Sequence, residues 1–220
     1  MKIKKEVKGW DYLCLALYAF LGFGSEALLA YVIEPLVYGN TINEWTTIQI
    51  ITHWISISII WGLVFYCLVK LSSKKYNFDL FAKVEPMKKM QWLLVSICVV
   101  FVFVLKYIDW NGFKVLKEFI AWGTLKFVFL YIYYAFETAL FMLIIIFGQK
   151  AFEVWFKDKK IPYGGIAVAF TWGLGHAFTK GNIMTGILAA LAGFVFGVTY
   201  LLVNRDIRKT YILLFIMFVF

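Results

Sequence analysis

Residues 131–147, YIYYAFETALFMLIIIF, decide the fold, and Glu137 is the one acidic or basic residue among them. Apolar residues continue upstream to Phe127, directly after Lys126, and Gly148 follows the stretch. The hydrocarbon core of a bilayer is about 30 Å thick, and a helix needs roughly 20 apolar residues to cross it. The range 127–147 has this length, so we predict that it forms a membrane-spanning helix.

Outward from this stretch, further apolar runs recur along the whole chain. The chain is 63% hydrophobic and only 16% charged, whereas soluble domains are about 45–50% apolar and about 25% charged. A bilayer accepts this apolar surplus on the outside of a helical bundle. We therefore predict an all-α fold, a polytopic transmembrane bundle of about seven helices, built as a single integral-membrane domain over residues 1–220. The other runs are 12–33, 48–69, 90–105, 166–178, 184–203 and the shorter 211–220.

The net charge of +9 follows the connections between these runs. Seventeen of the 22 Lys and Arg residues lie in the N-terminal segment and in segments 70–89, 150–160 and 205–209, and five lie in the alternate connections. Because cytoplasmic loops carry an excess of Lys and Arg, this alternation predicts a cytoplasmic N-terminus. The lipid bilayer is thus the expected partner, with a weak attraction to anionic lipid and no nucleic acid. The first apolar run is too long for a signal-peptide core, so we expect it to be retained.

The positions of the cysteines argue against two kinds of structural site. Cys14, Cys67 and Cys98 stand singly inside apolar runs, which predicts neither a disulfide framework nor a zinc ribbon.

Gly193 and Gly197 form a GxxxG pair, which is typical of a close contact between two membrane helices.

Ionisable residues within a membrane span are functional candidates. Glu137 lies 11 residues from both Lys126 and Gly148, about 16 Å from either end of its helix and near mid-bilayer. A carboxylate at this depth must be protonated, paired or metal-bound. It either ties two helices together as a neutral acid or takes part in chemistry. Tyr133, Tyr134 and Phe141 share its helical face, and the two hydroxyls are candidate donors to it.

His176 is the second candidate, in FTWGLGHAFTKGN over residues 170–182. Gly173 and Gly175 leave room beside the imidazole, and Trp172 lies one turn back. A carboxylate and an imidazole together can bind a metal or activate a water, while a histidine satisfied within the core is the alternative. His176 lies only four residues before Lys180, nearer the helix end than Glu137, so the helices must tilt or slide for the two to meet.

Glu26 and His53 are weaker candidates. Glu26 follows GFGS in the first run, where it would line an internal cavity. His53 lies five residues into its run, where we expect it to anchor the helix at the membrane interface. Either residue would have to complete a metal site built on Glu137 and His176.

The motifs over roughly residues 120–220 resemble the CPBP family, the CAAX prenyl protease and bacteriocin-processing (Abi) intramembrane proteins. The similar stretches are 137–141, 172–176 and the glycine-rich run that ends in Gly197-Val-Thr-Tyr. Members of the family carry three signatures on successive helices: EExxxR, FxxxH, and a last His with Asn or a similar residue four positions later. The resemblance implies a CPBP-like core of several membrane helices, in which a glutamate and histidines activate a water that attacks a peptide bond.

Carried over one residue at a time, the match is partial. Glu137 corresponds to the first Glu of the first signature, but Thr138 and Met142 replace the second Glu and the Arg. His176 corresponds to the second-signature histidine, with Trp172 in place of Phe. The third signature should fall at residues 213–217, which contain no His.

The sequence therefore leaves three functions open. The first is an intramembrane endopeptidase with Glu137 and His176 as catalytic residues, a substrate pocket of Tyr133, Tyr134, Phe141 and Trp172, and a divalent metal such as zinc as the candidate cofactor. A membrane-embedded or prenylated peptide would be its substrate, and the plasma membrane of a bacterium its location. The second is an inactive relative with a binding, regulatory or immunity-type role. The third is a small transporter with Glu137 as a proton or cation site.

Overall fold

The computed structural model describes residues 7–220, and every regular element within this range is helical. The elements are α1 (Gly9–Leu28), the π-helical turn η1 (Leu29–Ile33), α2 (Glu34–Tyr38), the 3-10 turn η2 (Ile42–Glu44), α3 (Thr47–Tyr76), α4 (Lys89–Trp110), α5 (Lys114–Phe156), α6 (Tyr163–Val168), the π-helical turn η3 (Ala169–Gly173), α7 (Leu174–Thr179), α8 (Ile183–Leu202) and α9 (Ile207–Val219). The predicted all-helical fold class is confirmed.

Five of the helical segments are long and apolar enough to cross a membrane. They are Gly9–Tyr38, Thr47–Tyr76, Lys89–Trp110, Lys114–Phe156 and Ile183–Leu202. The other two predicted runs also form helices, but they are shorter: 17 residues over 163–179 and 13 residues in α9. At 1.5 Å per residue they measure about 25 Å and about 20 Å, less than the thickness of a hydrocarbon core.

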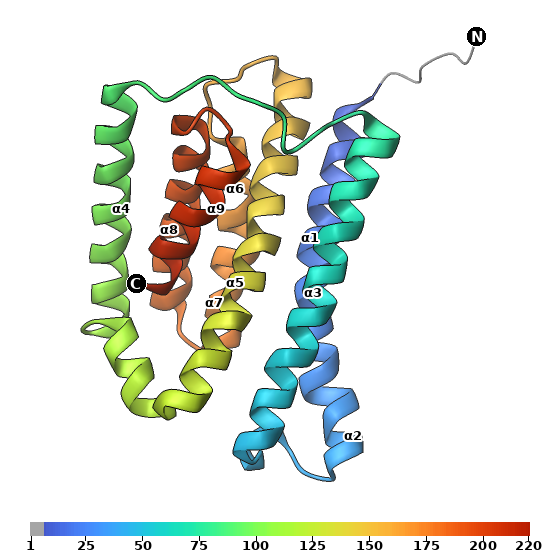
Figure 1. Cartoon of the computed structure of the whole chain (residues 1–220), viewed down its shortest axis with the longest axis vertical. Helices are drawn as coiled ribbons and strands as arrows, with labels where there is room; N and C mark the ends of the chain where they lie inside the picture. The colour runs from blue at the N-terminus through green and yellow to red at the C-terminus, as the bar shows by residue number, and fades with distance from the viewer. Residues whose placement is uncertain (1–6) are drawn as a thin grey trace.

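Helix α5 is the central element of the bundle. It runs between the pair α1 and α3 on one side and the group α4, α8 and α9 on the other (Figure 1). Ten consecutive residues, 140–149, are buried, so this part of α5 has no face toward lipid or water. A helix that is apolar all round is expected in such a place, which explains why residues 140–147 carry no polar side chain.

A sharp bend divides α5 at Gly123, whose backbone has φ 68° and ψ 169°. Figure 1 shows the short segment before this residue folding back at the end of the bundle opposite the N-terminus. This region of backbone space is open essentially to glycine alone. The bend returns Lys114 and Glu118 to the bundle, where both are buried.

Replacing this glycine gives a test of the bend. Gly123→Ala is expected to lower the free energy of unfolding by about 1–3 kcal/mol, because of backbone strain alone. An added Cβ would meet nothing within 4 Å. The melting midpoint in detergent measures the effect, with Gly24→Ala as the control, since Gly24 has equal space but lies inside α1. Equal midpoints for the two variants would contradict the assigned bend.

Close glycine contacts hold α8 against α6. A Cβ on Gly197 would collide with the backbone N and Cα of Gly165, and a Cβ on Gly165 would lie 2.5 Å from the carbonyl oxygen of Phe194. A Cβ on Gly193 would lie 3.3 Å from the backbone N of Ala169. The close helix contact predicted from the GxxxG pair is confirmed.

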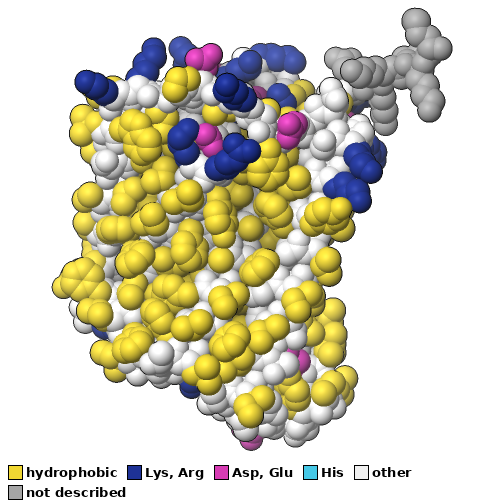
Figure 2. Space-filling view, in the orientation of Figure 1, with side chains coloured by type: hydrophobic (Ala, Val, Ile, Leu, Met, Phe, Trp, Pro, Cys, Tyr) yellow, Lys and Arg dark blue, Asp and Glu magenta, His cyan; other side chains and the backbone are white. Residues whose placement is uncertain are grey.

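The outer surface of the bundle is apolar along its sides. Figure 2 shows hydrophobic side chains over most of the visible face, with Lys and Arg side chains concentrated at one end. Large apolar residues on the outside include Leu36, Ile120 and Phe178, which are 82%, 82% and 89% exposed. Such a surface is suited to a lipid environment rather than to water.

Candidate functional site

Glu137 lies on α5 just before the continuously buried residues 140–149, and it is itself 8% exposed. Its carboxylate oxygen Oε1 accepts a hydrogen bond from the indole Nε1 of Trp172 at 2.9 Å. The two tyrosines expected to donate to this carboxylate donate elsewhere: Tyr133 to Glu26 and Tyr134 to Glu118. The prediction of tyrosine donors is therefore wrong, because each hydroxyl reaches a different carboxylate, Glu26 on α1 or Glu118 on the far side of the bend in α5.

His176, one helical turn further along the chain, also contacts Trp172. Its Nδ1 lies 2.8 Å from the carbonyl oxygen of Trp172, and the two ring centres are 4.5 Å apart. A carbonyl oxygen can only accept, so Nδ1 carries the proton and donates it. In the neutral imidazole Nε2 is then the nitrogen with a free lone pair.

Trp172 thus contacts both of the predicted catalytic residues. It belongs to the π-helical turn η3 between α6 and α7, and such turns are frequent at functional sites. Its side chain holds the Glu137 carboxylate, and its main chain holds His176. The sequence placed Trp172 in the pocket, but it did not reveal that this residue contacts both partners.

Aromatic rings enclose this arrangement. The ring of Phe141 lies 4.8 Å from that of Trp172, and Phe218 from α9 lies 5.5 Å from Trp172. Phe196 stacks on Phe141 at 5.3 Å. Phe141 and Trp172 therefore pack beside the Glu137 carboxylate, whereas the hydroxyls of Tyr133 and Tyr134 donate to Glu26 and Glu118. The surroundings of the Glu137 carboxylate are apolar and tightly packed.

A second polar cluster joins α1, α2, α3 and α5. His53 Nδ1 lies 2.6 Å from Glu34 Oε2, and His53 Nε2 lies 3.8 Å from Glu26 Oε1. Glu26 Oε1 also accepts a hydrogen bond from the Tyr133 hydroxyl at 2.8 Å. His53 is 4% exposed, so the expected role as an anchor at the membrane interface is wrong. Trp45 covers the imidazole with its ring centre 5.2 Å away, and its buried indole N–H has no partner within residues 7–220.

Glu34 is a member of this cluster that sequence reasoning missed. Glu26 and Glu34 are eight residues apart, which in a regular α-helix turns their side chains about 80° away from each other. The π-helical turn η1 lies between them and accommodates one extra residue. The two carboxylates then project almost like residues seven apart and face His53 together. The available signal was a second acidic residue directly after the apolar run 12–33.

A third cluster surrounds the end of α9. Lys114 donates to the carbonyl oxygen of Phe218 at 3.1 Å and lies 3.9 Å from Glu118 Oε1. The last carbonyls of a helix have no partner within it, and a cation at this end is favourable. Glu118 also accepts hydrogen bonds from Tyr131 and Tyr134.

Lys106 belongs to the same region as Lys114. Its ammonium lies 5.1 Å from the ring centre of Phe218, which Lys114 faces at 4.4 Å. Both lysines are among the five that the sequence analysis counted in the alternate connections, but they are 8% and 3% exposed and lie inside the bundle. Basic residues that count toward topology can therefore also be buried groups.

The candidate metal site does not form as expected. A catalytic zinc needs three protein ligands. Glu26 or His53 would have had to join Glu137 and His176, but both are held in their own cluster with Glu34. Among residues 7–220 no group of three or more His, Cys, Asp or Glu residues is placed to hold a metal. Residues 7–220 therefore do not supply the ligand set of a catalytic zinc.

The chain was also compared with known proteins. No protein-family model, curated protein or solved structure matches it.

Proposed function

We propose that the protein is a CPBP-type intramembrane endopeptidase in which Glu137 and His176 activate a water molecule. The observation that supports this best is the contact of both residues with Trp172. We further propose that the chain crosses the plasma membrane of a bacterium about seven times with its N-terminus in the cytoplasm. The alternation of basic segments supports this arrangement.

The chemistry can be followed from the hydrogen bonds. The Trp172 indole orients the carboxylate through Oε1, which leaves Oε2 to take a proton from a water. The resulting hydroxide attacks the carbonyl carbon of a peptide bond. His176, fixed through Nδ1, presents Nε2 to hold the water or, when protonated, to stabilise the developing oxyanion. The proton on Glu137 then passes to the leaving amine, so protons balance over one turnover.

A second function is favoured by the packing around the same residues. Phe141 and Phe218 press against Trp172, and Met142 stands where the family has an Arg. A carboxylate in such a closed apolar site also suits an inactive relative that binds a membrane peptide as a regulatory or immunity-type protein. Binding without turnover separates this function from the first.

Substitutions at the acid and the imidazole test the peptidase. Purified protein in vesicles would be given a panel of transmembrane and prenylated peptides, with cleavage followed by mass spectrometry. Glu137→Gln and His176→Ala are each expected to reduce cleavage by at least about 100-fold, since a positioned acid or base contributes about 10²–10⁴-fold. Trp172→Phe removes the indole donor but keeps a ring, so a smaller loss is expected.

Glu85→Gln, at an exposed carboxylate in the loop between α3 and α4, is the control and should cleave as well as the parent. Equal cleavage by all variants would reject the roles of Glu137 and His176. If no peptide is cleaved while one binds the parent protein, the inactive relative becomes the better description.

A further inference from the structure

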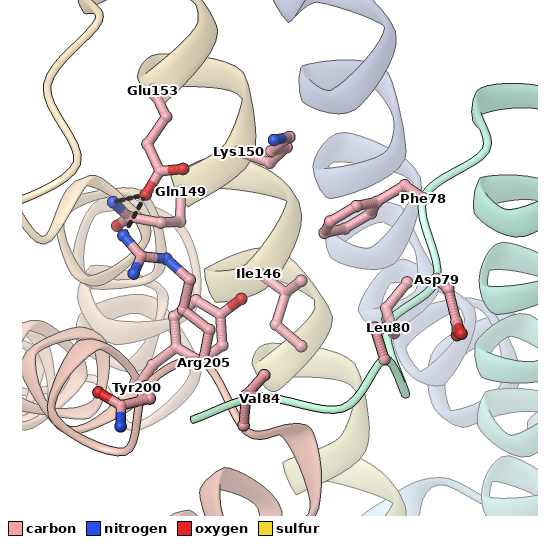
Figure 3. A pocket seen from close by; sticks show the side chains of 12 residues that line it. Phe78, Asp79, Leu80, Val84, Ile146, Gln149, Lys150, Glu153, Tyr200 and Arg205 are labelled. Atoms are coloured by element: carbon pink, nitrogen blue, oxygen red, sulfur yellow. Dashed lines mark hydrogen bonds and ion pairs between the residues drawn. The ribbon is translucent and has the colours of Figure 1, made fainter. Parts of the chain in front are cut away.

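A cavity of about 190 Å³ lies at the basic end of the bundle, away from Glu137 and His176. The segment 77–88, which connects α3 to α4, passes over it, and α5 and the turn from α8 to α9 form its other walls (Figure 3). Its lining residues are Phe78, Asp79, Leu80, Ala82, Val84, Ile146, Gln149, Lys150, Glu153, Tyr200, Asn204 and Arg205. The cavity therefore combines an apolar wall with several polar groups.

The position of the cavity corresponds to the boundary between lipid and water. Its residues on α5 lie one to three turns from the basic-end terminus of this helix, and Trp155 in the same stretch packs against Trp10 with ring centres 4.9 Å apart. Tryptophans gather at the depth of lipid headgroups. The many Lys and Arg side chains at this end attract anionic headgroups in particular (Figure 2).

Three polar side chains around the cavity already use an acceptor oxygen in hydrogen bonds within the protein. Glu153 Oε1 accepts from Arg205 at 2.7 Å and from Gln149 at 2.9 Å. Gln149 Oε1 accepts from the backbone of Gly164, and Asn204 Oδ1 accepts from Gln91. Each of these three side chains thus has an acceptor oxygen already engaged by the protein.

Two donors, by contrast, have no hydrogen-bond or ion-pair partner within residues 7–220. The Tyr200 hydroxyl points toward α5 beside Ile146 (Figure 3), although the tyrosine is only 4% exposed. The Lys150 ammonium lies 5.7 Å from the ring centre of Phe78, with no carboxylate within 4.0 Å in the described chain. A hydroxyl and an ammonium that both lack an acceptor within the described residues favour a ligand with negatively charged oxygen atoms.

The backbone at the edge of the cavity is held in an uncommon conformation. Asn204 and Arg205 are consecutive non-glycine residues with φ of 57° and 64°. Backbone strain of this kind persists where surrounding contacts impose it, and it concentrates at binding sites. Here the contacts are those from Gln91 to Asn204 and from Arg205 to Glu153. The turn from α8 to α9 is thereby fixed against α4 and α5, which shapes the cavity in advance.

From these observations we propose that the cavity binds the phosphate ester of an anionic lipid headgroup. A volume of about 190 Å³ exceeds the roughly 150 Å³ that holds benzene, but it is below the range of about 300–1,000 Å³ for drug-sized ligands. Lys150 and Tyr200 bind the phosphate oxygens, and Leu80, Val84 and Ile146 contact the glycerol and the first methylenes. This site is independent of the proposed peptidase.

Lipid binding can be measured directly on the full chain. Protein freed of lipid in a neutral detergent would be titrated with phosphatidylglycerol, phosphatidylcholine, glycerol 3-phosphate and inorganic phosphate, and bound lipid counted by native mass spectrometry. We expect phosphatidylglycerol to bind at least ten-fold more tightly than the other three. Lys150→Gln and Tyr200→Phe should each weaken this binding by about ten-fold, the usual effect of losing a hydrogen bond to a charged group.

Lys74→Gln is the matched control, because Lys74 is an exposed lysine near the basic end of α3 that does not line the cavity. Tyr200→Phe removes a single oxygen and keeps the buried ring, so it remains informative if the lysine variant fails to fold. Equal losses for Lys74→Gln and Lys150→Gln would show general surface attraction and overturn the proposal. Equal affinity for glycerol 3-phosphate or inorganic phosphate would assign the cavity to a soluble phosphate instead of a lipid.

Discussion

Alanine at Gly197 or Gly165 is expected to lower the free energy of unfolding by more than about 3 kcal/mol, and valine to prevent folding. Inserting methylenes into a packed core usually reduces stability by about 1–3 kcal/mol and sometimes by more. Here the added Cβ would strike backbone atoms of the facing helix, namely Gly165 N and Cα or the carbonyl oxygen of Phe194. Backbone cannot rotate away as the tip of a side chain can, so α6 and α8 would have to separate.

Circular dichroism melting in detergent measures this effect. Gly175→Ala, in the short helix α7, is the control, because a Cβ there meets nothing within 4 Å. Its midpoint should stay unchanged or rise slightly, since alanine favours a helix over glycine by about 1 kcal/mol. Midpoints that agree between Gly197→Ala and Gly175→Ala would show that α6 and α8 are not in close contact.

Glu34→Ala is expected to lower the free energy of unfolding by about 3–5 kcal/mol. Glu34 and His53 form a contact of 2.6 Å with side chains that are 7% and 5% exposed. Removing one member of a buried pair leaves the other without its partner in an apolar surrounding, and losses of this size are usual. His53→Ala should produce a similar loss, because it leaves the carboxylates of Glu34 and Glu26 facing each other.

A double-mutant cycle separates the pair from its surroundings. The variant carrying both alanines should lose about 1–3 kcal/mol less than the sum of the single losses, because neither buried group remains unpaired. Unfolding in detergent with increasing sodium dodecyl sulfate is a suitable measurement, with Glu85→Ala as the exposed control. Strict additivity of the two single losses would mean that Glu34 and His53 do not interact.

The three polar clusters share a physical pattern. Each lies where a helix departs from regular α-helical geometry: the turn η1 beside Glu34, the bend at Gly123 near Glu118, and the turn η3 that holds Trp172. Such irregularities turn polar side chains toward the interior and bring them to partners on other helices. The partners satisfy groups that would otherwise be isolated in an apolar environment.

Several features of the candidate site were predictable from local sequence. The central position of Glu137 in its apolar run was predictable from its equal spacing from the two ends of that run. Trp172 and His176 are one turn apart, so their contact is also local. The hydrogen bond from Trp172 to Glu137 joins residues 35 positions apart, and no periodicity in either helix indicates it.

The sequence by itself determined that the chain is helical, where its apolar helices run and which connections are basic. These properties follow from the free energies of transferring the side chains of each run from water to the bilayer. Those free energies do not depend on which other helices the run contacts. Only the tertiary structure decided that Glu34 meets His53, that Lys114 and Lys106 enter the bundle, and that Trp172 donates to Glu137. Those contacts depend on the rotation of each helix about its axis, and single π-helical turns and one glycine bend change that rotation without a clear mark in the sequence.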